Sequence, residues 1–143
     1  MTAKEYLMEI QRCKRAMETL GQRAEQLRTE MEGLKAITYD KDRVQVSPSN
    51  RMEELMPRLI EAEERYGKAI FKYHTMVQTR TEQIYNLGNE KLSSVLAYRY
   101  IDGLKWEQIA VKMGYSYRNV IKLHGKALGA FTHKYKVFLV FPY

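Results

Sequence analysis

Three short helical pieces separated by glycines make up the segment 92–128, and this segment constrains the fold more than any other. The first piece is expected to stop at Asp102 and Gly103. The second is followed by Gly114, where a glycine in the left-handed conformation can close a helix. Ser116 then stands where an N-cap belongs, so a third helix is predicted to begin there. Two short helices joined by a tight turn predict a helix-turn-helix, whose second helix can enter the DNA major groove.

Apolar residues in the second and third pieces recur at helical spacing, which predicts an inward face for each helix. In the second piece, predicted over 106–113, they are Trp106, Ile109, Ala110 and Met113. In the third piece they are Val120, Leu123, Ala127 and Leu128. Many small helical bundles share this pattern and never contact DNA, so the pattern alone does not separate a plain bundle from a DNA-binding unit.

The residues of this segment, YRYIDGLKWEQIAVKMGYSYRNVIKLHGKAL, resemble region 4 of the bacterial sigma-70 family, which reads the −35 promoter element. They are more similar still to small phage and prophage proteins with a sigma-region-4-like C-terminus, the late-gene transcriptional regulators of the RinA/ArpU type. The resemblance covers about a third of the chain. The matching positions are Tyr98, Arg99, Tyr100, Ile101, Trp106, Glu107, Ile109, Ala110, Gly114, Ser116, Val120, Leu123, Lys126, Ala127 and Leu128.

The chain also departs from the family pattern. Lys105 stands where the family often has a Ser or Thr cap, so the start of that helix is expected to be frayed or capped in another way. The residues 117–119 and 122 differ from those of housekeeping sigma factors, so the target sequence cannot be copied from the −35 element. The resemblance implies activation of late phage genes, with RNA polymerase as a second partner.

The helix-turn-helix interpretation predicts double-stranded DNA as the partner and assigns roles to exposed polar residues. Arg and Lys side chains suit guanine edges and Asn suits adenine. The residues expected to reach the bases are Tyr117, Arg118, Asn119 and Lys122. The residues expected to contact phosphate are Ser116, Lys126, Lys105 and Lys112.

The positive charge lies around these residues. The whole chain carries 24 Lys and Arg against 17 Asp and Glu, a net charge of +7. Residues 88–143 hold 9 basic and 3 acidic residues, which is +6, whereas residues 1–87 hold 15 and 14, which is +1. This uneven distribution is typical of a phosphate-binding module and argues against a generic basic surface.

An apolar residue recurs in alternating steps of four and three near the N-terminus, which predicts a coiled-coil seam in a helix over about 3–36. The seam residues are Tyr6, Ile10, Cys13, Met17, Leu20, Ala24, Leu27, Met31 and Leu34. Gly21 and an Arg23–Arg28 pair weaken a parallel dimer. The seam therefore either joins two copies or packs antiparallel on the second long helix of the same chain.

That second helix is predicted over about 50–87, after a loop at 37–49 in which Val44 and Val46 favour a short extended piece. Asn50 and Glu53 form a capping-box pattern at its start. Pro57 should bend the helix or delay its start. Arg80 interrupts the apolar stripe, so the register is expected to slip there. Tyr66 and Tyr73 fall on the inner face.

These patterns predict an all-α protein: two long coiled-coil-like helices followed by a C-terminal sigma-70 region 4-like helix-turn-helix. The expected domains are a helical arm over 1–87, a DNA-binding domain over 88–134 and a tail over 135–143. The tail is apolar and β-prone, and could form a strand, a helix end or a disordered segment.

Other classes of function find no support in the residues. We find no constellation for catalysis and no site for a cofactor, so an enzyme is not expected. His74, His124 and His133 are too far apart for metal-ligand spacing, and His124 is expected at the surface or facing phosphate. The lone Cys13 and the lack of any apolar run long enough to span a bilayer indicate a soluble cytoplasmic protein with no membrane contact. The resemblance to phage regulators implies that this cytoplasm is that of a bacterial host.

Two alternatives to a regulator remain open. A terminase small subunit-like packaging protein also joins a helix-turn-helix to coiled-coil helices, but it forms rings. A protein-interaction module that binds RNA polymerase would bind no DNA at any salt concentration. For the regulator itself we expect a homo-oligomer, with a dimer favoured.

Overall fold

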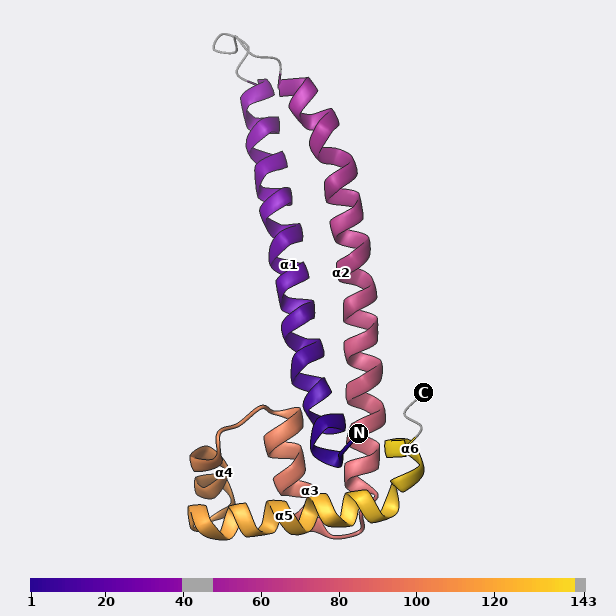
Figure 1. Cartoon of the computed structure of the whole chain (residues 1–143). Helices are drawn as coiled ribbons and strands as arrows, with labels where there is room; N and C mark the ends of the chain where they lie inside the picture. Colours follow the sequence, from indigo (N-terminus) through magenta and orange to yellow (C-terminus); the bar gives the residue numbers. More distant parts are fainter. Residues whose placement is uncertain (40–47, 141–143) are drawn as a thin grey trace. The chain divides into compact units, whose positions relative to one another are not determined.

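A computed structural model describes residues 1–39 and 48–140. The described residues form helices and no strand (Figure 1). The elements are α1 (Ala3–Tyr39), α2 (Pro48–Tyr85), α3 (Glu90–Leu96), the π-helical turn η1 (Ala97–Ile101), α4 (Trp106–Met113), α5 (Tyr117–Lys134) and α6 (Lys136–Val140). The all-α prediction is confirmed. The predicted extended piece at Val44 and Val46 lies outside the described residues.

The chain divides into two compact units, and the division does not follow the predicted boundary near residue 88. The composite unit contains residues 1–13 and 73–143, and the hairpin unit contains residues 14–72. Helices α1 and α2 therefore each contribute one part to the composite unit and the other part to the hairpin unit.

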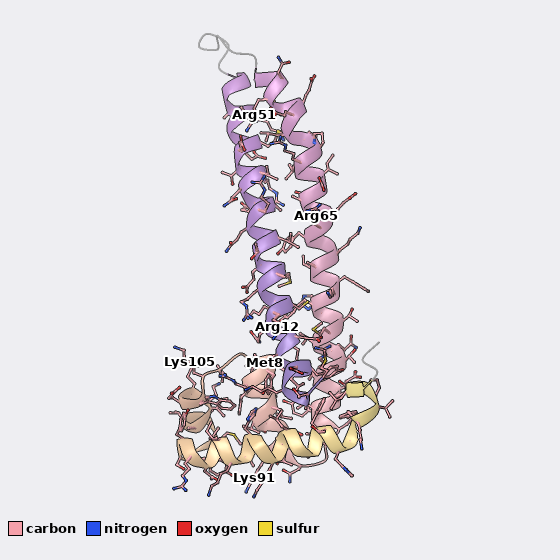
Figure 2. All side chains as sticks on the ribbon, viewed as in Figure 1. Met8, Arg12, Arg51, Arg65, Lys91 and Lys105 are labelled. Carbon is pink, nitrogen blue, oxygen red and sulfur yellow. The ribbon has the colours of Figure 1, made fainter. Side chains whose placement is uncertain are left out.

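In the hairpin unit the predicted seam packs against α2 of the same chain. Leu27 and Met31 of α1 are buried with Leu55 of α2, surrounded by half-buried Leu34, Met52, Leu59 and Ala62. Arg28 binds Glu63 at 2.9 Å, and Arg51 binds Glu30 at 2.6 Å between the two helices (Figure 2). Partner numbers fall along α2 as they rise along α1, so the two helices are antiparallel.

A glycine of α1 and two prolines of α2 occupy special positions in this hairpin. Gly21 lies against the ring of Tyr66, and a Cβ at Gly21 would stand 2.9 Å from that ring. Helix α2 begins at Pro48 rather than at Asn50, because proline suits the first turn of a helix. Asn50 is therefore not an N-cap, and Pro57 lies inside α2 without delaying its start.

In the composite unit, Arg80 shows that the predicted register slip is wrong. The side chain is 5% exposed and points to the inner face, in step with Tyr73, Val77 and Ile84. Its guanidinium donates to the backbone oxygen of Tyr6 and binds Glu9 at 2.9 Å. It also lies 3.9 Å from the centre of the Tyr6 ring. Arg80 thus fills a core position, because α1 supplies partners for its charge.

The core of the composite unit joins the chain ends to the C-terminal helices. Leu7, Ile10, Ile84, Val95, Leu96, Ile109, Val120, Ala127 and Phe131 are fully buried in it. The Tyr6 hydroxyl donates to Gln83 at 2.8 Å, and Ser93 donates to the Ile84 backbone oxygen at 2.8 Å. Helix α5 packs on α3 and α4 (Figure 1). In the tail, residues 136–140 form helix α6, and Leu139 of this helix packs into the core.

Candidate nucleic-acid interface

Helix α4 has the predicted bounds and a cap at each end. The side-chain oxygen of Gln108 accepts the backbone N–H of Lys105 at 2.9 Å, which is the bond that the N3 residue makes in a capping box. Gly114 has φ +70 and ends the helix in the left-handed conformation, as predicted. The backbone N–H of Tyr115 then donates to Ala110 at 3.0 Å. The turn between α4 and α5 is thus fixed by backbone bonds.

Ser116 is the N-cap of α5, as predicted. Its Oγ accepts the backbone N–H of Asn119 at 3.2 Å, so one of the free donors at the start of the helix is satisfied. The helix continues to Lys134, where the predicted DNA-binding domain also ends. Because the cap fixes the first residue of α5, it also fixes which side chains occupy the first turn.

The inward face of α5 is closely packed, and this sets the direction of the opposite face. Val120, Ala127 and Phe131 have no exposed surface, and Leu123 and Leu128 are half-buried against the same core. At 100° per residue, Arg118 and Lys122 lie near the middle of the outward face. Tyr117 and Asn119 lie at its two edges.

All eight predicted contact residues are exposed: Ser116, Tyr117, Arg118, Asn119, Lys122, Lys126, Lys105 and Lys112. Five of them belong to α5, Ser116 caps that helix, Lys112 lies on α4, and Lys105 immediately precedes α4 (Figure 2). Lys112 lies 5.6 Å from the centre of the Tyr98 ring. The structure therefore brings the α5 residues together on one helix, with Lys112 on the neighbouring helix α4 and Lys105 at the N-cap of α4.

The outward face of α5 is positive and its charges are available. The helix carries Arg118, Lys122, Lys126 and Lys134 and no Asp or Glu. Within the part of the chain that the structure describes, Arg118, Lys122 and Lys126 form no ion pair. An exposed cation without an internal partner can bind an external anion without first breaking a bond.

His124 corrects a prediction, because it lies beneath this surface rather than on it. The side chain is 9% exposed, and its Nε2 is hydrogen-bonded to the Tyr100 hydroxyl at 2.7 Å. The Trp106 ring meets the imidazole edge-on, with centroids 4.6 Å apart. The Arg99 guanidinium stacks on the Trp106 ring, 4.3 Å from its centroid, and donates to the Leu104 backbone oxygen at 3.0 Å. This cluster joins η1, α4 and α5.

Burial controls protonation in the cluster. It lowers the pKa of His124 to about 4, with Lys4 and Arg99 adding repulsion of a second positive charge. Burial also raises the pKa of Tyr100 to about 12. The pair is therefore neutral at physiological pH, and His124 serves as a packed polar link between η1 and α5.

Two residues of this region escape sequence reasoning. Gln11 of α1 donates to the Tyr100 backbone oxygen at 3.0 Å and the Ile101 backbone oxygen at 3.3 Å, so it holds the turn before α4. Gly103, with φ +68, allows the close approach of that side chain. Ile121 is 37% exposed and lies beside Arg118, at the edge of the outward face that Tyr117 also borders. Helical spacing could have found Ile121, whereas nothing local points to Gln11.

Comparison with known proteins adds no relative to these observations, since the chain matches no family model, no curated protein and no solved structure. Within the described ranges 1–39 and 48–140, no cluster of three His, Cys, Asp or Glu side chains could hold a metal ion. No helix in these ranges is long and apolar enough to cross a membrane.

Proposed function

We propose that α4, the Gly114 turn and α5 form a helix-turn-helix that binds double-stranded DNA, and that the protein regulates transcription. The observation that carries the proposal is the outward face of α5. Arg118, Lys122 and Lys126 are exposed there and form no ion pair with any residue that the structure describes, on a helix whose opposite face is buried. A rigid helix with a positive outward face suits the major groove.

Within this proposal α5 is the recognition helix, and its first turns meet the base edges. Arg118 and Lys122 are suited to guanine, and Asn119 to adenine. Tyr117 borders the same face, and the exposed Ile121 is suited to the methyl group of thymine. Ser116 and Lys126 contact phosphate, and Lys105 and Lys112 extend that contact to α4.

The biological role comes from the resemblance to sigma region 4 and to the RinA/ArpU-type regulators. On that basis we propose a phage-encoded regulator that activates late genes and contacts the host RNA polymerase. The finding that the matching positions Ile109, Val120 and Ala127 are buried together supports the shared arrangement of these helices.

The proposal is tested by selecting duplexes from a random library with the full chain and measuring their binding by fluorescence anisotropy over a range of salt concentrations. We expect a preferred sequence and a log–log salt slope of about −4 to −7, which corresponds to about 5 to 8 phosphate contacts per dimer. A flat salt response, or equal binding of all duplexes, would contradict the proposal.

A further inference from the structure

The outer face of α2 in the hairpin unit carries large apolar side chains that nothing in the described structure covers. Phe71 is 75% exposed, Ile60 is 51% exposed and Met56 is 42% exposed. They line two adjacent shallow hollows that share Glu64. We name this surface the outer stripe, and its residues are Glu53, Met56, Pro57, Ile60, Glu61, Glu64, Gly67, Lys68 and Phe71.

The outer stripe is a continuous helix face and lies opposite the packed one. Ile60, Glu64, Gly67 and Phe71 follow each other in steps of four, three and four, which is the spacing of one helix face. Leu55, whose side chain contacts α1, lies half a turn away from Glu64 on the helix. The intramolecular seam therefore leaves this second apolar face available to a partner.

Charge and size along the outer stripe indicate what that partner is. The half of the stripe before residue 64 is acidic, with Glu53 and Glu61, and the half after it carries Lys68, with Lys72 next to the stripe on α2. A helix with this polarity is complementary to a copy of itself that runs in the opposite direction. We infer that the protein forms a two-fold symmetric dimer in which the outer stripes of two copies pack antiparallel.

The pairing has a definite register. With the two-fold axis between residues 63 and 64, Ile60 of each copy packs over Gly67 of the partner subunit, and Met56 packs over Phe71 of the partner subunit. A Cβ at Gly67 would meet nothing within 4 Å, so this position has space for a partner's side chain. Because a two-fold interface repeats every contact, both pairs occur twice.

The same register brings opposite charges together. Glu61 lies on the same flank of the stripe as Lys68 of the partner subunit. Within its own chain Glu61 binds Arg65 at 2.8 Å, but both side chains are more than 60% exposed, so that pair is weak and leaves Glu61 accessible. Glu64 of each copy lies beside the axis, and Lys68 one helical turn away offsets the repulsion between the two carboxylates.

The first test compares two glutamate variants by sedimentation equilibrium of the full chain. Phe71→Glu should raise the dimer dissociation constant at least about tenfold, because it buries a charge at the interface. Val137→Glu is the matched control, since Val137 is 74% exposed on α6, and it should leave the dimer unchanged. Both variants should keep the wild-type helix content, which shows that each chain still folds, and only Phe71→Glu should lower the melting temperature, because dimerisation stabilises the native state. A monomeric wild type, a ring of higher order, or a dimer that tolerates Phe71→Glu would overturn the inference.

A charge exchange tests the antiparallel register. Glu61→Lys and Lys68→Glu should each weaken their own homodimer, because each variant places like charges opposite one another. An equimolar mixture of the two variants should form a heterodimer that is at least about tenfold tighter than either homodimer, since both cross-subunit pairs are then of opposite charge. A mixture no tighter than the separate variants would contradict this register.

Cysteine crosslinking locates the axis. In a Cys13→Ser background, Glu64→Cys should form a disulfide-linked dimer, because the two positions face each other beside the axis. Ile60→Cys is the control, since the two copies of position 60 would lie about 10 Å apart along the helix, too far for a disulfide. Crosslinking of both variants would indicate parallel helices, and crosslinking of neither would place the contact elsewhere; each result would overturn the inference.

Discussion

The Tyr100 hydroxyl lies 2.7 Å from Nε2 of His124, and this hydrogen bond connects η1 to the middle of α5 beneath the candidate DNA-binding surface. The Trp106 ring of α4 meets the imidazole edge-on, and Arg99 of η1 stacks on Trp106. The positive charges of Arg99 and of Lys4 on α1 disfavour a charged imidazole. The orientation of α5 therefore depends on a histidine that stays neutral.

This relationship predicts acid sensitivity. The pKa of His124 is about 4 in the folded protein against an ordinary 6.5, so the unfolded chain binds a proton that the folded chain does not bind between these values. Stability should fall as the pH drops from 6.5 to 4, by up to about 3 kcal/mol from this group. Urea unfolding of His124→Gln should show a smaller slope against pH over that range. His133→Gln, at an exposed position, should retain the wild-type slope.

The buried pair of Arg80 and Glu9 should be worth far more than an exposed pair of the same geometry. Arg80→Met removes the ion pair with Glu9 at a site where Arg80 is 5% exposed. We expect the free energy of unfolding to fall by about 3–5 kcal/mol. Arg65→Met breaks an Arg–Glu contact of similar length at the surface and should cost less than about 1 kcal/mol. Thermal or urea unfolding measures both, and equal losses would contradict the assigned role of Arg80.

Two glycines should respond to alanine with opposite signs. Gly114 has φ +70, so Gly114→Ala should destabilise the protein by about 1 kcal/mol through backbone strain. Gly125 lies inside α5, where Gly125→Ala should stabilise by about 0.5–1 kcal/mol. A Cβ at either position meets nothing within 4 Å, so packing does not confuse the comparison. The same sign for both variants in urea unfolding would be evidence against the turn geometry.

Arg118 and Lys126 should separate base reading from phosphate binding. Arg118→Ala should lose about 1–3 kcal/mol on the cognate duplex and relax the preference at one base pair. Lys126→Ala should weaken all duplexes about equally and reduce the salt slope by about one unit. Neither variant should change the melting temperature, since both side chains are exposed. Competition binding with cognate and scrambled duplexes decides, and an equal loss on both would remove Arg118 from the base-reading set.

Ile121 offers a test on the DNA rather than on the protein. If its side chain contacts a thymine methyl group, replacing that thymine by uracil removes the contact and leaves the base pair intact. We expect a measurable loss of affinity at one thymine of the selected site, and Ile121→Ala should abolish the difference between thymine and uracil there. Val111→Ala, at an exposed position of α4, should preserve it.

The parts of the fold that local physics controls were predictable. The bounds of α4 and α5, the left-handed Gly114 and the Ser116 cap agree with the sequence, because each depends on residues within one turn. The predicted register slip at Arg80 and the predicted surface position of His124 were wrong. A polar residue on an apolar helix face resembles an interruption of that face until its buried partner is known. Those partners, Tyr6 and Glu9 for Arg80 and Tyr100 for His124, are distant in the chain. The DNA contacts of the eight candidate residues stay predictions.

The composite unit consists of two separate segments, residues 1–13 and 73–143. Its core therefore cannot form during synthesis until the second segment has been made. The core partners Ile109, Val120 and Phe131 are synthesised about a hundred residues after Ala3, Tyr6, Leu7 and Ile10. The hairpin unit has only nearby partners and can form in the interval, since local helix pairs close quickly. Once formed, it shortens the loop between residues 13 and 73 and lowers the entropy cost of closing it. The first turns of α1 then remain apolar and uncovered until the C-terminal helices are complete.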